Sequence, residues 1–321
     1  RLKRWSANSA KGFQSQFDLL LEYLGQDASL HVTSDTANDV KRMLISIPKG
    51  SRGRGKLQSI SLPELMKLQG HERMSAKNIS KYLRTYSTFF EWAVKRKETS
   101  ENNFKVLVDE VKHKKQVRDA FTPEQVTTML DELLHNTHGL VKKDYQKWGT
   151  LIALYTGARL NEVAQLRVAD IRQIDDVWCF DFNDEGDDMQ LKNNASRRTV
   201  PVHAGLIQAG LLHFIEQVRK EGKERLLHEL TLNSHNGYGR NLSRWFGNTF
   251  LPKLGMKTKK LVFHSLRHTA VTCLFRAGVD EPIVKTLIGH ALGGVTHQVY
   301  AKGYTTAQLK AAIDKMHPVS A

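Results

Sequence analysis

Apolar residues recur with helical spacing in the first hundred positions of the chain. Downstream of Ser75 they fall at positions 79, 82, 83, 86, 90 and 94, three or four residues apart for the most part. This spacing predicts an amphipathic helix that runs to about Arg96, with Ser75 as its N-cap. Segments 13–24 and 36–47 are also expected to be helical. Because an amphipathic helix must bury its apolar face, these segments are expected to pack together as a helical domain.

A second domain is expected to begin near position 118. Residues 112–118 are mostly basic or polar, and a new helix start follows them. There Thr122 can act as N-cap, and Pro123 stands in the first turn. The pattern therefore divides the chain into residues 1–117 and 118–321, each long enough to bury a core of its own. Further helices are expected near 123–134, near 145–156 and from about Arg159 onward.

Two segments of the second domain are expected to be strands. Residues 177–182 and 198–202 are rich in β-branched and aromatic side chains, and the polar stretch between them is expected to form a hairpin or small sheet. Helices are expected from Ala204 to the end. The predicted fold class is therefore mainly α with a small antiparallel β-sheet. The final helix, 306–316, has an apolar stripe that we expect to dock on a neighbouring protomer, with packing on its own chain as the alternative.

The charge of the chain indicates a polyanionic partner. The formal net charge is +15, and the isoelectric point is near 9.7. A strongly basic protein gains affinity for nucleic acid by releasing counterions, and an anionic membrane surface is the alternative partner. No segment approaches the roughly 18 consecutive apolar residues of a spanning helix, and no signal peptide is recognised. Double-stranded DNA is therefore the expected partner, with no membrane association.

Cysteine usage indicates the cellular compartment. Only Cys179 and Cys273 are present, far apart in the sequence. This argues against a disulfide framework and for a reducing cytoplasm, where we expect the protein to act at the bacterial nucleoid. The chain begins at Arg1 and not at methionine, which leaves room for a missing amino-terminal portion.

Candidate chemistry gathers in three motifs. Segment 264–269 contains His264 and Arg267, segment 287–290 adds His290, and Tyr300 follows; upstream, segment 156–162 supplies Arg159. A guanidinium donates two parallel hydrogen bonds to phosphate oxygens, and imidazoles move protons or donate hydrogen bonds. A phenol can attack a phosphodiester. The motifs therefore predict phosphoryl transfer.

The order and spacing of these motifs resemble those of the tyrosine recombinases, the phage and mobile-element integrases. The resemblance extends from about Phe121 to the C-terminus, and the first domain resembles the helical core-binding domain of these enzymes. It implies a site-specific recombinase that cuts and rejoins DNA through a 3′-phosphotyrosyl intermediate and integrates or excises a phage or mobile element. It also implies a homotetramer on DNA that needs no ATP, metal or other cofactor, and it allows accessory DNA-bending proteins as partners.

The resemblance assigns a role to each candidate residue. Arg159 and Glu162 match the first catalytic arginine and its acidic companion, although a surface ion pair at this spacing is the commoner explanation. Arg267, His264 and His290 match the groups that stabilise the pentavalent phosphate. Read alone, His290 would be a residue at the C-cap of a helix that ends near Gly289.

Two further positions complete the implied site. Lys192 begins a pattern that continues through Ser196, Arg198 and the Val200-Pro201 pair. It would protonate the leaving 5′ oxygen, and a solvated turn lysine is the alternative. Tyr300 is the implied nucleophile. It stands ten residues after His290, one more than the family spacing, and Tyr304 is the lesser candidate.

Other kinds of site and function are disfavoured. His264, His268, Cys273 and His290 suggest a metal site, but zinc ligands usually show tighter paired spacings. Residues 50–56 match most of a P-loop, but Leu57 stands where a hydroxyl is needed and no strand–helix context surrounds the loop. The alternative functions are a nicking and resealing enzyme like the type IB topoisomerases, and a catalytically silent DNA-binding regulator.

Overall fold

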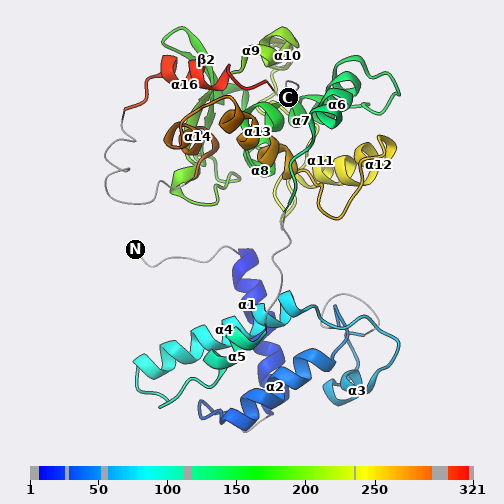
Figure 1. Cartoon of the computed structure of the whole chain (residues 1–321), viewed down its shortest axis with the longest axis vertical. Helices are drawn as coiled ribbons and strands as arrows, with labels where there is room; N and C mark the ends of the chain where they lie inside the picture. The colour runs from blue at the N-terminus through cyan, green and yellow to red at the C-terminus, as the bar shows by residue number, and fades with distance from the viewer. Residues whose placement is uncertain are drawn as a thin grey trace. The chain divides into compact units, whose positions relative to one another are not determined.

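The chain folds into two compact units, residues 1–115 and 116–321. The structure is a computed structural model that describes residues 7–25, 29–51, 57–111, 118–234, 236–290 and 303–317. Each unit has a hydrophobic core of its own (Figure 1), and each is described by itself.

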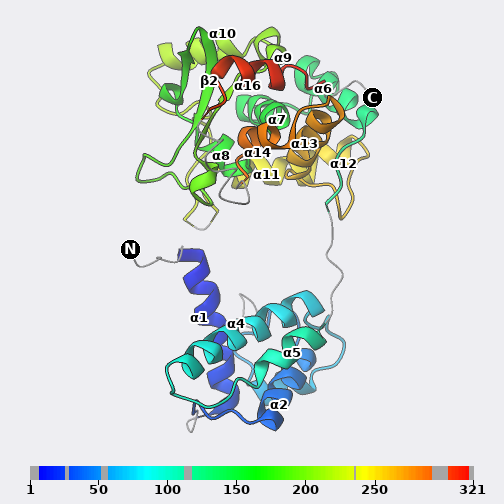
Figure 2. The same cartoon turned by 60° about the vertical axis from the view of Figure 1, so that its left-hand side comes forward.

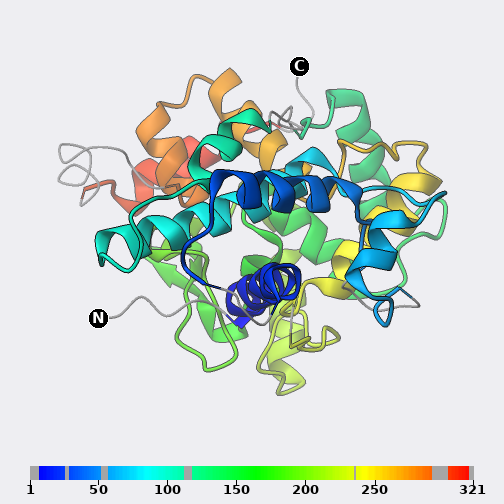
Figure 3. The same cartoon turned by 90° about the horizontal axis from the view of Figure 1, so that it is seen from below.

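The amino-terminal unit is helical. Its helices are α1 (Ala7–Leu24), α2 (Ser34–Ser46), α3 (Leu62–Lys67), α4 (Ala76–Lys95) and α5 (Phe104–Glu110). As predicted, α4 begins after Ser75, whose side chain accepts a hydrogen bond from Asn78 N. Helix α4 packs against α1, α2 and α5. Seen from below, α1 is viewed nearly along its axis and α2 lies in the plane of the picture beside it (Figure 3). The short helices α3 and α5 were not predicted individually.

The carboxy-terminal unit contains a three-stranded antiparallel sheet in the order β1 (Ile171–Ile174), β2 (Val177–Phe182), β3 (Arg198–Pro201). The two predicted strands are confirmed, β2 with the expected bounds. Strand β1 was missed. It joins β2 through Asp175 and Asp176, whose φ angles of 48° and 61° fit a two-residue type I′ turn. The polar stretch before β3 is a connection containing the 3-10 turn η2 (Asn194–Ser196) and adds no strand to the sheet.

Helices surround this sheet and one another. They are α6 (Pro123–His135), α7 (Asp144–Thr156), α8 (Leu160–Ala164), α9 (Ala204–Gln208), α10 (Leu211–Lys220), α11 (Arg240–Trp245), α12 (Leu251–Lys253), α13 (Ser265–Arg276), α14 (Glu281–Ile288) and α16 (Thr306–Ile313), with a 3-10 turn η1 (Val168–Asp170) and a π-helical turn η3 (Phe246–Phe250). Ten of the thirteen residues of α7 are buried. It packs against α6, α8, α9, α11 and α13 (Figure 2). Helix α7 is thus the centre of this unit, and the predicted fold class is confirmed.

The last helix, α16, packs on its own unit. Leu309, Ile313 and Met316 are buried in the core, and the helix contacts β2, β3 and α14. Beyond its end, Ala204 N donates to Asp314 Oδ1 over 3.0 Å. In this single chain the stripe packs as the alternative expected, because α16 covers a face of the sheet; docking on a neighbouring protomer stays a prediction.

No helix within the described ranges is both long enough and apolar enough to span a membrane.

A buried hydrogen bond joins α1 to α4, and its removal is expected to weaken the amino-terminal unit. Tyr86 is fully buried, and its hydroxyl donates to Gln16 O over 2.8 Å. Tyr86→Phe removes this buried hydrogen bond, which costs about 1 kcal/mol of unfolding free energy. Urea unfolding of the whole chain measures the loss. Tyr82→Phe, at a half-buried position of the same helix, is the control and should cost less. Equal stability of Tyr86→Phe and the parent chain would contradict this role.

Candidate active site

A sharp turn after α7 directs Arg159 into the site. Gly157 ends α7 in the left-handed region, with φ of 62°. A Cβ at this position would lie 3.2 Å from Ile288 Cγ2 and 3.3 Å from Ala270 Cβ, so the close approach of α13 and α14 favours glycine. Arg159 follows in extended conformation as the N-cap of α8. The turn at Gly157 therefore precedes an arginine whose side chain reaches Glu162.

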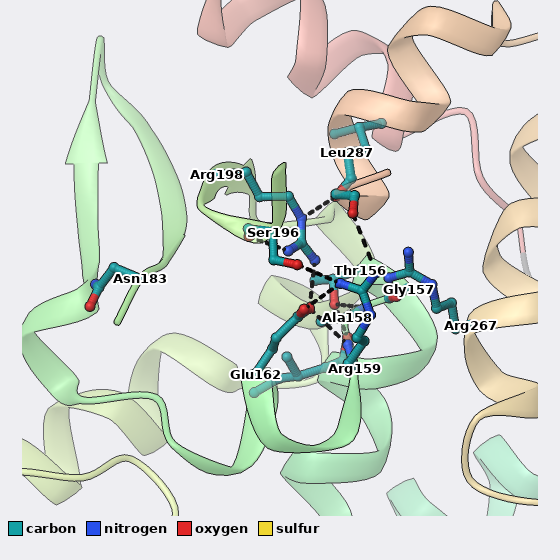
Figure 4. A network of polar contacts seen from close by, with 12 residues as sticks. Thr156, Gly157, Ala158, Arg159, Glu162, Asn183, Ser196, Arg198, Arg267 and Leu287 are labelled. Carbon is teal, nitrogen blue, oxygen red and sulfur yellow. Dashed lines mark hydrogen bonds and ion pairs between the residues drawn. The ribbon is translucent and has the colours of Figure 1, made fainter. Parts of the chain in front are cut away.

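Glu162 is the hub of the polar network in Figure 4. Its Oε1 accepts from Arg159 Nη1 over 2.6 Å, and its Oε2 accepts from Arg159 N over 2.9 Å and from Arg198 Nη2 over 3.1 Å. The side chain is only 3% exposed, so the alternative of a surface ion pair is wrong. Arg159 precedes α8 as its N-cap, and Glu162 caps the helix from the third position.

The charge of Glu162 is maintained by its partners. Desolvation alone would raise the pKa of this buried carboxyl, but the charge of Arg198 and the hydrogen bonds from Arg159 outweigh it and lower the pKa below its ordinary value. Glu162 is therefore a buried carboxylate at neutral pH, and it fixes the direction of the Arg159 guanidinium. Ser196 adds a second restraint, since its Oγ accepts from Arg159 Nη1 over 2.9 Å.

Arg267 presents an unused donor to the site. It lies in the first turn of α13 and is 4% exposed. Its Nη1 donates to Gly157 O over 2.8 Å, whereas its buried Nη2 has no hydrogen-bond partner among the described residues. Desolvation, followed by the charges of Arg159 and Arg198, lowers the pKa of Arg267 to about 10, so it remains a cation at neutral pH. A buried donor of this kind is costly unless an acceptor arrives, and an anion would satisfy it.

Three histidines border the arginines. His264 is the N-cap of α13, and its ring lies 5.1 Å from that of His268, perpendicular to it. His290 follows Gly289, the left-handed C-cap of α14, and its N–H donates to Lys285 O over 2.9 Å.

Both site histidines are neutral at pH 7 in this state. Desolvation, then the charges of His268, Arg267, Arg159 and Lys192, lowers the pKa of His264 to about 4. Desolvation and the same two arginines, with Arg198 and Lys285, lower that of His290 to about 4. Both residues keep exposed surface, so the charges of the surrounding cations contribute to the lowered pKa even where desolvation is incomplete. A neutral imidazole can donate one hydrogen bond and accept another.

The structure brings together five of the seven predicted site residues and places a sixth beside them. Arg159, Glu162 and Arg267 belong to one polar network. After desolvation, the charges of the two arginines lower the pKa of His264 and His290, which places these histidines near the network. Lys192 is exposed in the connection between β2 and β3, and its charge reaches His264. Tyr300 lies outside the described residues. Tyr304 is half-buried against the core just before α16.

Sequence reasoning missed Arg198 as a member of the site. It was read only as part of the pattern that follows Lys192, yet it is buried and bonded to Glu162. The available signal was a cation at an inward position of a strand, beside a buried Val-Pro pair.

No three His, Cys, Asp or Glu side chains within the part of the chain that the structure describes are placed to hold a metal ion. His264 and His268 do lie together, as the metal alternative required, but the described residues supply no third ligand beside them. The P-loop-like segment lies largely outside the described residues.

An ionic cluster anchors the connection that carries Lys192. Asp188 accepts from Tyr238 Oη over 2.5 Å and is paired with Arg225 and Arg167. The hydrogen bond from Tyr238, and then Arg225, lower the pKa of Asp188 to about 2. The Arg225 guanidinium lies 4.1 Å above the Tyr238 ring. These contacts fix the connection four residues before Lys192.

The anchor is expected to stabilise the unit in a defined pH range. The folded-state pKa of Asp188 is depressed, so its contribution is present above the unfolded pKa of about 3.9 and is lost as pH falls toward 2. Asp188→Asn should therefore unfold at lower urea than the parent chain at pH 7, and this difference should shrink below about pH 4. Asp187→Asn, at the exposed neighbouring position, is the control. A difference that stays constant from pH 7 to pH 3 would contradict the anchor.

Comparisons with known proteins identify the family of the chain. The model of the phage integrase family matches residues 119–306, more than half of the chain. The tyrosine recombinase XerD of Staphylococcus epidermidis is 27% identical over 250 residues, which cover 76% of this chain and 77% of the relative.

Solved structures share the fold. The Tn1549 transposon integrase in complex with circular intermediate DNA is 16% identical, with a TM-score of 0.61, and the match covers 97% of this chain and 94% of that one. A λ integrase tetramer bound to a Holliday junction is 13% identical, with a TM-score of 0.57, over 91% of this chain and 74% of that one. The family prediction is confirmed: the chain belongs to the phage integrase family of tyrosine recombinases.

Proposed function

We propose that this protein is a site-specific recombinase that cleaves DNA by forming a 3′-phosphotyrosyl bond with Tyr300. The observation that carries the proposal is the pair of arginines beside Gly157. Arg159 is oriented by a buried carboxylate, and Arg267 has a buried N–H group with no acceptor among the described residues. Two guanidinium groups held in this way suit the non-bridging oxygens of one phosphate.

In the proposed cleavage step the phenol of Tyr300 gives its proton to solvent, its oxygen forms a bond to the scissile phosphorus, and the bond from phosphorus to the 5′ oxygen breaks. Arg159 and Arg267 offset the negative charge that builds up on the phosphate oxygens, and His264 and His290 donate hydrogen bonds as neutral imidazoles. Lys192 gives its proton to the departing 5′ oxygen. The new phosphodiester retains the free energy of the old one, so attack by another 5′ hydroxyl rejoins the DNA without ATP.

The partner of this reaction is double-stranded DNA. The net charge of +15 favours association with a polyanion, and the solved relatives named above are bound to a circular intermediate and to a Holliday junction. We infer a homotetramer during strand exchange, an amino-terminal unit that binds the core site, and a phage or mobile element as the encoding source. Accessory DNA-bending proteins and action at the bacterial nucleoid belong to the same proposal.

The nucleophile is tested with a nicked suicide substrate made from the junction sequence of the encoding element. The parent chain and Tyr304→Phe should form a covalent adduct, and Tyr300→Phe should form none, because the loss of one hydroxyl removes the attacking oxygen. Binding of the site should persist in Tyr300→Phe, since backbone contacts dominate affinity. Gel shifts and peptide mapping of the adduct measure both. An adduct on Tyr304 would contradict the proposal and assign the role of nucleophile to Tyr304. DNA relaxation without site preference would favour a topoisomerase-like activity, and site binding without any adduct a silent regulator.

The general acid is tested by changing the leaving group. Lys192→Ala should slow cleavage of the ordinary substrate by at least about 100-fold. A substrate with sulfur at the bridging 5′ position should be cut by Lys192→Ala at nearly the rate of the parent chain, because a thiolate leaves without protonation. Single-turnover rates on both substrates measure the rescue. Equal losses on oxygen and sulfur would remove Lys192 from this role.

A further inference from the structure

Each of the three nitrogens of the Arg198 guanidinium donates to a protein acceptor. It enters the site from β3 with its side chain 5% exposed. Its Nε donates to Leu287 O over 2.7 Å, its Nη1 to Ser196 O over 2.8 Å, and its Nη2 to Glu162 Oε2 over 3.1 Å. One face of the guanidinium lies 4.5 Å from the Phe182 ring centre. Every nitrogen of this group therefore has a protein acceptor.

The other two arginines of the site differ from Arg198 in this respect. The Arg159 side chain is 20% exposed, and Arg267 has an unpartnered Nη2 among the described residues. Arg267 can thus offer a whole nitrogen to an anion, and Arg159 can offer exposed surface, whereas each nitrogen of the buried Arg198 already donates to a protein acceptor. The three cations have distinct tasks.

We propose that Arg198 is a positioning residue that keeps Glu162 ionised and ties the end of α14 to β3, so that Arg159 and His290 are aligned before DNA binds. This inference rests on the proposed function, because cleavage is the reaction whose rate it predicts. Arg198 itself touches no DNA.

Two sets of contacts carry the inference. Glu162 is faced by Arg198 from β3, by Arg159 at the start of α8 and, more weakly, by Arg267 from α13. Loss of Arg198 would leave a buried carboxylate with one direct cation, and the pKa of Glu162 would rise. Protonated Glu162 would then hold Arg159 less firmly.

The second set concerns α14. Leu287 O lies in the last turn of that helix, where backbone carbonyls lack intrahelical partners, and Arg198 Nε donates to it. Two residues on, a Cβ at Gly289 would lie 2.9 Å from Arg198 Nη1, so the chain passes closely over the guanidinium before it reaches His290. The position of His290 therefore depends on Arg198.

The experiment measures single-turnover cleavage of the suicide substrate against pH. Arg198→Met should cleave at least about tenfold more slowly than the parent chain at neutral pH. The acid limb of its pH–rate profile, where the cleavage rate falls as the pH decreases, should move up by about one pH unit or more. Affinity for the DNA site should stay within about threefold. Arg197→Met is the matched control: Arg197 is the exposed neighbour, paired with Asp184 and Glu185, and its loss should not move the limb.

A double-mutant cycle separates positioning from a purely structural role. In a Glu162→Gln background there is no carboxyl to titrate, so Arg198→Met should no longer shift the acid limb. The rate of the double variant should lie within about threefold of the slower single variant. Full multiplication of the two losses would overturn the proposal, as would an unshifted acid limb.

Arg198→Lys provides a second measurement, which stands even if Arg198→Met fails to fold. Lysine keeps the charge beside Glu162 but cannot contact three acceptors at once. The acid limb should return close to that of the parent chain, while cleavage at neutral pH remains several-fold slower. Parental cleavage rates in Arg198→Lys would overturn the proposed role of the hydrogen bond from Arg198 to Leu287 O of α14. No adduct from the parent chain would instead overturn the proposed function.

Discussion

The site depends on one buried carboxylate, Glu162, that lies among three mutually repelling arginine side chains. Besides desolvation, the charge of Arg159 lowers the pKa of both Arg198 and Arg267, and Glu162 is the one carboxylate described in the network of these three arginines. Without Glu162 the mutual repulsion of these cations would have no buried counter-ion, and desolvation would add to the cost. The fold meets this constraint by bringing α8, β3 and α13 together around α7.

This constraint explains why the site is assembled from distant parts of the chain. Glu162 and Arg198 are joined by a buried ion pair across α8 and β3, and Arg267 contacts the end of α7 through Gly157 O. No local segment could supply three guanidinium groups and also keep them apart. The sheet and the central helix therefore position charge as well as filling the core.

Much of this arrangement could be predicted from the sequence, for identifiable physical reasons. Ser75 and Thr122 mark helix starts because their side chains accept from the backbone three residues on. Gly157 and Gly289 mark helix ends because left-handed backbone favours glycine. Strand β1 was missed because it is only four residues long and its turn is formed by two aspartates without glycine.

The parts of the site that could not be predicted depend on tertiary contacts. The partners of Arg198 lie on α8 and α14, far away in sequence, so no local pattern distinguishes it from the exposed Arg197 beside it. The same holds for Asp188, whose partners Arg225 and Tyr238 lie on a separate loop. The motif order indicated the chemistry of the site, whereas the orientation of its cations required the three-dimensional structure.

The ends of two helices have a consequence for how this site receives an anion. Each of the three arginines donates to a carbonyl at the C-terminus of α7 or α14: Arg267 to Gly157 O, Arg198 to Leu287 O and Arg159 to Gly289 O. A helix C-terminus carries partial negative charge, and here it stabilises cations. Many phosphate sites present the positive N-terminus of a helix directly to the ligand. In this protein the polarity is reversed: helix dipoles hold the guanidinium groups, which are in turn the groups that would face an anion.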